Sequence, residues 1–282
     1  MIVGGGAKVN EQRRLAPLGH VSPNVSAWLA MLRRAPRGRV GSAPGWVIAA
    51  WVVAAVAAIA IITVVTDVSA VTQAARLPQW FVDIFGEITD FGKSGWVLVP
   101  TGCILLAVGL AASLRIGRMA NLILAALSVR LSFVFLAVGI PGLFVTIVKR
   151  LIGRARPFVG GAENPYLYHP FSWRPDFASM PSGHATSAFA TALAIGTVWP
   201  RSRPFVWTYA LVIAASRVIV TAHHPSDVVA GALVGTVGMI LVRNWFAARR
   251  LGFTVGNDGR VRAMPGPSWR RIKTIAGRLF HQ

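Results

Sequence analysis

Charged residues are scarce in this sequence of 282 residues, and acidic residues are the scarcest of them, with 9 Asp and Glu against 29 Lys and Arg. Only 13% of the residues are charged and 54% are hydrophobic, whereas an average soluble protein carries about 25% charged residues. This balance excludes an ordinary soluble domain, a disordered chain and a collagen-like chain. The single cysteine, Cys103, excludes a disulfide scaffold. Because Cys103 lies in an apolar run, we expect a packed thiol.

Long apolar runs take the place of the missing charge. A membrane-spanning helix needs about 20 apolar residues, and the run from Trp46 to Val65 meets that length. It begins too far from Met1 and is too long to be a secretory signal. Five further runs follow: Trp96 to Leu114, Leu131 to Val148, Ala185 to Trp199, Phe205 to Ala222 and Val228 to Val242. The sequence therefore predicts an all-α fold, a six-span transmembrane helical bundle. A large soluble helical core is the alternative, but tryptophans gather at the ends of the runs, as they do at membrane interfaces.

The basic residues predict how the spans are oriented. Residues 1–44 hold seven Lys and Arg against one Glu, and the segment from Arg243 onward holds nine against one Asp. The positive-inside rule places both ends in the cytoplasm, which an even number of spans permits. We therefore expect a basic, disordered cytoplasmic tail at 1–44, a six-span domain at 45–247 and a basic cytoplasmic tail at 248–282. Attraction to anionic lipid explains this charge, and no base-reading motif accompanies it, so we expect no nucleic-acid partner.

One basic cluster lies on the side predicted to be external. Lys149 and Arg156 follow the third span seven residues apart, and Pro157 comes next. If the helix continues to Pro157, seven residues make two turns, so both cations face one point. Side chains reaching from a helix end toward the membrane surface are the structural alternative.

The segment Met180-Pro181-Ser182-Gly183-His184 precedes the fourth span. Proline and serine often start helices, and a helix N-terminus offers free N–H groups that bind phosphate. Gly183 permits close approach to the backbone. A plain helix cap would explain Pro181 and Ser182, but it leaves His184 without a role.

The third polar segment runs from Ser216 to Asp227. Arg217 interrupts an apolar span, where an ionisable residue indicates a functional site. His223 and Asp227 are four residues apart, a spacing at which a carboxylate can orient an imidazole and leave its other nitrogen free as a nucleophile. A purely structural His–Asp contact is the alternative, and His224 competes with His223 for the role.

Together these segments place three cations, a helix N-terminus and histidines at one membrane face, which predicts an oxyanion guest. Phosphoryl transfer needs mainly positioning and charge neutralisation, and Lys149, Arg156 and Arg217 could supply both without a metal or other cofactor. His223 would attack phosphorus, and His184 would protonate the leaving oxygen and then activate water. A zinc site built from the histidines and Asp227 is a rival that chelators would test.

The three segments resemble the signature motifs of the type 2 phosphatidic acid phosphatase and vanadium haloperoxidase superfamily, over about residues 46–247. The resemblance implies His223 as nucleophile rather than His224, His184 as general acid and Asp227 as the partner of the nucleophile. It also implies a phosphate site formed by five residues: Lys149, Arg156, Ser182, Gly183 and Arg217.

A membrane member of this superfamily is expected to be a lipid phosphatase in the inner membrane of a bacterium, with its site on the outer side. Its partners would be the bilayer and a lipid substrate of phosphatidate, phosphatidylglycerophosphate or undecaprenyl diphosphate type, with lipid A as an alternative. The sequence does not choose among them, and the resemblance favours an undecaprenyl or glycerophospholipid phosphate as a common substrate of the family. The oligomeric state is left open. The loop 157–180 could select a head group or only dip into the membrane. The alternatives are a phosphotransferase, a haloperoxidase, and a transporter or passive scaffold, although transporters tend to carry ionisable groups at the midplane between repeats.

Overall fold

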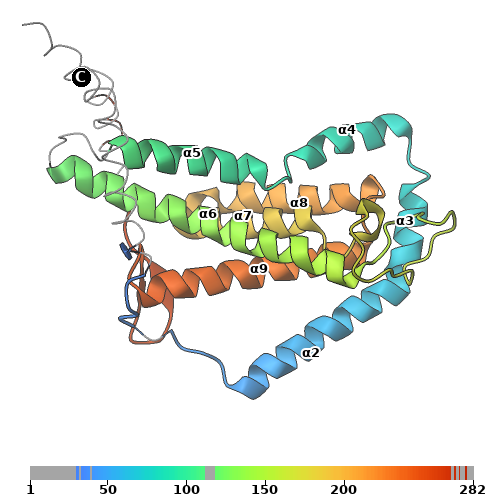
Figure 1. Ribbon diagram of the computed structural model, residues 1–282, viewed down its shortest axis with the longest axis horizontal. Coiled ribbons are helices and arrows are strands. Elements are labelled where there is room, and N and C mark those ends of the chain that lie inside the picture. Colours follow the sequence, from blue (N-terminus) through green and yellow to red (C-terminus); the bar gives the residue numbers. More distant parts are fainter. Residues whose placement is uncertain are drawn as a thin grey trace, which may run out of the picture.

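The chain folds as a bundle of long helices with a small two-stranded sheet at one end (Figure 1). The computed structural model describes residues 30–31, 33–38, 40–111 and 118–267, with Arg270, Lys273 and Gly277. The α-helices are α2 (Gly45–Ile62), α3 (Val68–Ala74), α4 (Gln79–Asp90), α5 (Gly95–Ala111), α6 (Arg118–Ile152), α7 (Gly183–Val198), α8 (Arg203–Ile219) and α9 (Pro225–Ala248). The shorter elements are the π-helical turn η1 (Thr63–Asp67), the 3-10 turns η2 (Pro175–Phe177) and η3 (Pro200–Ser202), and the strands β1 (Phe253–Val255) and β2 (Val261–Ala263).

The predicted helical membrane protein is confirmed in outline, since a helix covers most of each predicted span. Within the residues that the structure describes, four helical segments are long and apolar enough to cross a membrane: Gly45–Ala74, Gln79–Gly109, Met119–Ile152 and Pro225–Ala248. Helices α7 and α8 have 16 and 17 residues, which is short of the usual span of about 20. Cys103 is exposed on α5, so the expectation of a packed thiol was wrong. Its apolar surroundings in the sequence reflect a surface suited to lipid, not a protein core.

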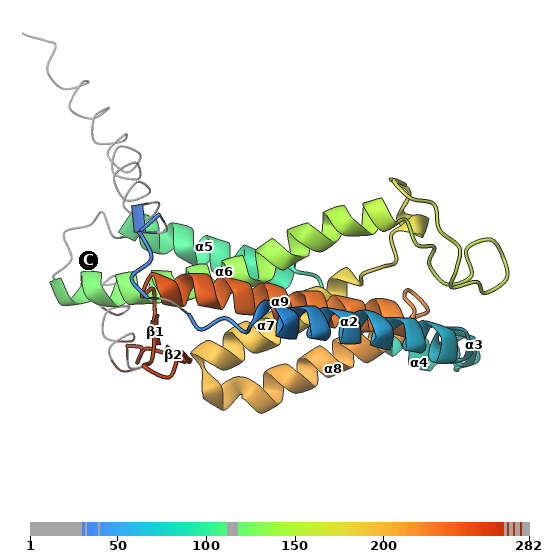
Figure 2. The ribbon, with the colours of Figure 1, turned by 90° about the horizontal axis from the view of Figure 1, so that it is seen from below.

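The first helix stands apart from the others (Figures 1 and 2). None of the 18 residues of α2 is buried, and Trp46 and Trp51 are more than 70% exposed. Burial begins only at its far end, where Asp67, Val71 and Ala74 contact the bundle. Helix α2 touches the bundle through α9 only in part, and an apolar helix with most of its surface uncovered needs lipid around it.

Two glycines of α9 allow it to lie very close to α7. A Cβ added at Gly231 would lie 2.3 Å from the carbonyl oxygen of Ser182, and one at Gly235 would lie 2.3 Å from that of Thr186. Backbones come this close only where a side chain is missing, which is the packing that the GxxxG spacing predicts. The contact fixes the start of α7 against the start of α9.

We expect Gly231→Ala to separate these two helix starts and to lower activity about tenfold or more, because the added methyl group has no room against a backbone carbonyl. The matched control is Gly142→Ala in α6, where an added Cβ meets no atom within 4 Å. Activity and thermal stability of the two purified variants would be compared with wild type. Equal behaviour of both variants would contradict a packing role for Gly231.

A hairpin closes the end of the bundle opposite the loop 157–180 (Figure 2). Strands β1 and β2 pair antiparallel, with Phe253 opposite Ala263. The ring of Phe253 is 2% exposed and packs against Phe133 of α6 at 4.8 Å between centroids. Arg130 donates from Nη2 to the carbonyl of Met264 at 2.9 Å. The hairpin lies in the range predicted as a C-terminal tail, and the sequence analysis did not anticipate it.

Candidate active site

The three predicted segments lie at the same end of the bundle, next to the loop 157–180 (Figures 1 and 2). They are the end of α6, the start of α7 and the turn between α8 and α9. His184, at the start of α7, interacts electrostatically with Arg217, His223, Lys93 and Arg156. The fold therefore gathers both histidines and two of the three predicted cations around one point.

Helix α6 ends earlier than the sequence suggested. It stops at Ile152, because Gly153 has a φ of 63° and its N–H donates to the carbonyl of Lys149 at 3.1 Å, a left-handed helix end. Lys149 and Arg156 are thus not two turns of one helix, although their charges still interact. Arg156 is placed by η2, since its Nε donates to the carbonyl of Pro175 at 3.1 Å. Burial lowers the pKa of Arg156 from its usual value, and the group stays cationic at neutral pH.

The start of α7 is not a plain helix cap. Ser182 occupies the cap position, but its side chain makes no capping hydrogen bond. Its Oγ is buried and has no hydrogen-bond partner among the described residues. A Cβ added at Gly183 would meet open space. A buried hydroxyl beside free helix N–H groups and open space fits an anionic ligand.

Arg217 approaches the same point from α8. Its side chain is 6% exposed, and Nη1 donates to Oγ1 of Thr89 at 2.6 Å. Its Nε is buried without a partner among the described residues. The residues after α4 close this side, since a Cβ on Gly92 would lie 2.9 Å from Cδ2 of His184. A guanidinium held at one nitrogen and unpaired at another suits an oxyanion.

His223 reaches Asp227 through a serine hydroxyl. Its Nδ1 lies 3.8 Å from Oδ2 of Asp227, longer than a hydrogen bond. Ser179 Oγ lies 3.4 Å from that Nδ1 and donates to Oδ2 at 2.6 Å. The hydroxyl can accept the Nδ1 proton of His223, which leaves Nε2 with its lone pair. Burial, together with the charges of Arg217 and Arg156, lowers the pKa of His223 to about 4, so the imidazole is neutral at pH 7.

His224 has both ring nitrogens engaged by carboxylates. Nδ1 lies 3.2 Å from Oδ2 of Asp227 and Nε2 lies 2.5 Å from Oε1 of Glu163. Both nitrogens donate in this arrangement, which requires the protonated ring. Burial opposes that charge, but the hydrogen bonds to Asp227 and Glu163 raise the pKa of His224 above its usual value. His224 therefore has no free lone pair, whereas His223 has one.

Several polar residues of the site were not predicted as parts of it. Ser179 directly precedes the segment that begins at Met180, and Glu163 comes from the loop 157–180 without any local pattern. Arg154 lies between Lys149 and Arg156 in the sequence but was not predicted as a site residue. Asp67 and Thr89 come from the first two helical segments, far outside the motifs. No motif in the sequence singles out either residue.

The zinc alternative gains no support from the geometry. Within residues 40–111 and 118–267, the structure shows no group of three or more His, Cys, Asp or Glu side chains arranged to hold a metal ion. The carboxylates bind arginine, serine and histidine instead.

Comparison with known proteins shows which family the sequence is similar to. The sequence model of the PAP2 superfamily matches residues 130–251. The lipid A 1-phosphatase of Rhizobium johnstonii is 36% identical over 177 residues, which cover 62% of this chain and 72% of the relative. The decaprenylphosphoryl-5-phosphoribose phosphatase of Mycobacterium tuberculosis is 36% identical over 96 residues, 34% of this chain and 50% of the relative.

Among solved structures, a transmembrane PAP2-type phosphatidylglycerolphosphate phosphatase from Bacillus subtilis is similar, with 19% sequence identity and a TM-score of 0.48. The superposition covers 68% of this chain and 94% of the Bacillus chain.

The sequence similarity and the helical membrane fold together define a phosphatase embedded in a membrane. The chain belongs to the PAP2 superfamily, in its membrane lipid phosphatase branch.

Proposed function

We propose that the protein hydrolyses a lipid phosphate without a metal, through a phosphohistidine formed on His223. Nε2 of His223 attacks phosphorus. His184, which takes up a proton when the phosphate anion binds beside it, gives that proton to the leaving oxygen. His184 then takes a proton from the water that releases phosphate, and Nε2 is regenerated. A second reading, transfer of the phosphoryl group to another lipid, differs only in the acceptor.

The observation that carries the proposal is a pair of unpaired polar atoms beside a neutral imidazole. Ser182 Oγ and Arg217 Nε are buried without partners among the described residues, and both belong to segments that adjoin His223 or His184. Buried polar groups are normally hydrogen-bonded. A tetrahedral phosphate that accepted hydrogen bonds from both groups and from the N–H groups of α7 would satisfy them. Lys149 and Arg156 would add charge, and Gly183 would leave room for the phosphate oxygens.

Asp227 is proposed to orient His223 rather than to react. It binds Ser179, which in turn contacts Nδ1 of His223. Phosphorylation of Nε2 makes the ring cationic, and a nearby carboxylate stabilises that cation. Hydrogen bonds of this kind often shorten when substrate binds, which would bring Asp227 into direct contact with His223.

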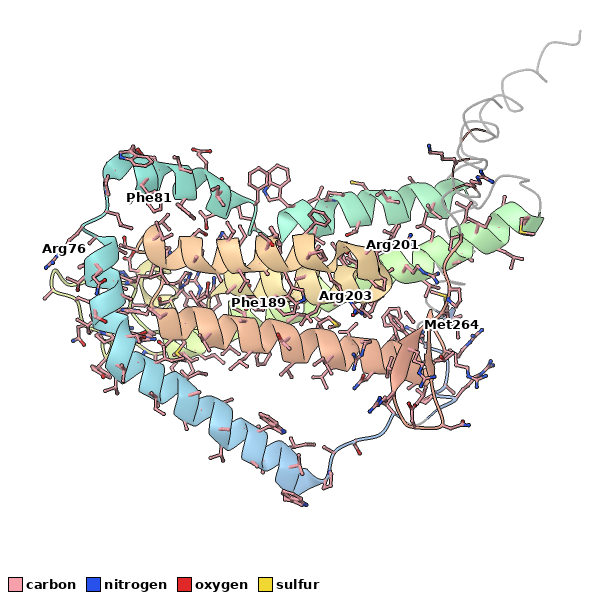
Figure 3. All side chains as sticks on the ribbon, turned by 180° about the vertical axis from the view of Figure 1, so that it is seen from behind. Arg76, Phe81, Phe189, Arg201, Arg203 and Met264 are labelled. Atoms are coloured by element: carbon pink, nitrogen blue, oxygen red, sulfur yellow. The ribbon has the colours of Figure 1, made fainter. Side chains whose placement is uncertain are left out.

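The proposed topology has six spans, with α7 and α8 as the two short ones, and both chain ends in the cytoplasm. In support, Arg201 and Arg203 lie at the end of the bundle near Met264, and Arg76 lies at the opposite end (Figure 3). The positive-inside rule then assigns the site to the outer face of a bacterial inner membrane. The domain division at residues 44 and 248 stays a proposal, in which the hairpin after 248 packs against α6 through Phe253. The basic segments before and after the spans would face anionic lipid and not nucleic acid.

The names of the relatives bear on the substrate. One acts on lipid A and the other on a decaprenyl-linked phosphoribose. We place a phosphate on a lipid-linked sugar first, ahead of phosphatidate, phosphatidylglycerophosphate and undecaprenyl diphosphate. The exposed aromatic side chains of the loop 157–180 suit a sugar head group, because flat rings stack against sugars. These side chains are Phe158, Tyr166, Tyr168, Phe171 and Trp173.

The test is release of inorganic phosphate by the purified protein in detergent, from lipid A and from each of the other lipid phosphates, with and without EDTA. We expect lipid A to lose phosphate fastest and EDTA to change the rate less than about twofold. Mass spectrometry of the products separates hydrolysis from transfer to another lipid. Turnover that stops with EDTA and returns with zinc would contradict the mechanism, and no release from any lipid would contradict the function.

A further inference from the structure

A buried carboxylate on the first helix is joined to the proposed active site. Asp67 is the last residue of the π-helical turn η1, and it is 0% exposed although α2 buries nothing. π-helical turns inside α-helices occur frequently at functional sites. Here the turn places one carboxylate in the bundle, directly after a helix that has no buried side chain.

Asp67 binds two residues that also bind Asp227 or adjoin it. Its Oδ2 accepts from Arg154 Nη2 at 2.8 Å and from Ser226 Oγ at 2.5 Å, and its Oδ1 accepts from the backbone N–H of Ser226 at 3.0 Å. Arg154 donates from Nη1 to Oδ1 of Asp227 at 2.6 Å and to Ser226 Oγ at 2.7 Å. One guanidinium thus lies between two carboxylates, and all three side chains are at most 1% exposed.

Because Arg154 binds both carboxylates, Asp67 affects how strongly the arginine charge offsets the charge of Asp227. If Arg154 faced Asp227 alone, its full charge would neutralise that carboxylate, which would then stabilise a cationic His223 less well. With Asp67 as a second partner, Arg154 is held at a fixed point and part of its charge is balanced elsewhere. The pKa of Arg154 is raised, since the two carboxylates outweigh the effect of burial, so the guanidinium stays charged throughout.

We propose that Asp67 is a positioning residue for the phosphatase reaction: through Arg154 it fixes Asp227 and preserves that carboxylate's negative charge for His223. The proposal rests on the proposed function, because it concerns the same nucleophile. It assigns the first helix a part in catalysis, although this helix lies outside the matched residues 130–251. The alternative is a structural role only, in which Asp67 fastens the first helix to the bundle.

The pH dependence of kcat/KM separates these roles. The group that it reports is His223, which must be neutral to attack. His223 is surrounded by Asp227 through Ser179, by Arg217 and Arg156, by His184 of α7, and by the adjacent charged His224. Asp67→Asn leaves all of these side chains in place. It changes only how strongly the positive charge of Arg154 offsets the negative charge of Asp227. Asp227 then stabilises the protonated form of His223 less, and His223 becomes less basic. The acidic limb of the pH profile of kcat/KM should therefore move to lower pH.

The experiment compares Asp67→Asn with wild type and with Asp83→Asn, which removes the same charge from an exposed carboxylate that accepts a hydrogen bond from Gln79. For Asp67→Asn we expect kcat to fall about 10- to 100-fold, KM to change less than about threefold, and the acidic limb to move down by about half a unit or more. Asp83→Asn should match wild type. Asp67→Glu, which keeps the charge, should return the limb toward its original position.

An unchanged kcat and limb in folded Asp67→Asn would overturn the proposal. So would lower thermal stability and lower activity with an unmoved limb, which is the result of a structural anchor. If the Asn variant does not fold, Asp67→Glu provides the test, because its longer side chain keeps the charge but moves Arg154. A kcat below wild type with unchanged KM and thermal stability supports positioning, and wild-type kcat overturns it. Failure of the proposed function is distinct, since it would show as turnover by His223→Ala or as no turnover by wild type.

Discussion

Replacing His223 with alanine is expected to abolish phosphate release, with kcat reduced by about 10⁴-fold or more, the size of effect that follows loss of an enzyme nucleophile. The reason is specific to this ring. It is the histidine of the turn whose Nε2 is not bound to a carboxylate, and its low pKa of about 4 keeps that nitrogen unprotonated at pH 7. Radiolabelled substrate should phosphorylate the wild-type protein transiently, and it should leave the variant unlabelled.

The control for this variant is His169→Ala. His169 lies in the loop 157–180, where its ring packs on Phe177 at 5.4 Å between centroids, and its loss should leave turnover within about threefold of wild type. Both proteins should remain in the membrane fraction and show similar thermal stability. Wild-type turnover by folded His223→Ala would refute the assigned nucleophile. Label on His224 instead of His223 would show that His224 is the nucleophile.

Replacing His184 with alanine is expected to slow hydrolysis of a lipid phosphate by about 10²- to 10⁴-fold, the usual contribution of a general acid. The loss should depend on the leaving group. A lipid alkoxide needs a proton as it departs, whereas p-nitrophenolate is stable as an anion. With p-nitrophenyl phosphate, the first step of the variant should therefore stay close to the wild-type rate.

The second step still needs His184 to activate water. Folded His184→Ala should give a burst of p-nitrophenol equal to the amount of enzyme, followed by slow turnover as the phosphohistidine accumulates. Stopped-flow absorbance measures the burst directly. An equal loss for both substrates without a burst would show that His184 binds phosphate and transfers no proton.

The parts of the fold that could be predicted are those written locally in the sequence. Apolar runs mark helices because lipid and core select the same residue types over a full span, and motif residues such as Ser182 and Arg217 lie within a turn of a helix end. The structure brings these segments to one end of the bundle. The close contact of α7 with α9 was also predictable, since its glycines recur at a fixed spacing.

The parts that could not be predicted depend on contacts between distant residues. Asp67 lies 87 positions before Arg154 and 159 before Ser226, and no local pattern relates them. The early end of α6 is a local effect. Gly153 and Pro157 are both residues at which the helix could end, and it ends at the glycine. The hairpin is held in place because Phe253 packs against Phe133. This contact joins residues that are far apart in the sequence, so no local pattern predicts it.

The isolation of α2 has a consequence for how this chain can change over time. None of its 18 residues is buried, although the helix touches α9, so bilayer thickness and the need for apolar side chains are the main constraints on its composition. Position 67, a turn further along, is bound from three directions. We therefore expect the residues of α2 to be exchanged freely for other apolar residues, while the aspartate at position 67 is kept, within one continuous helical segment.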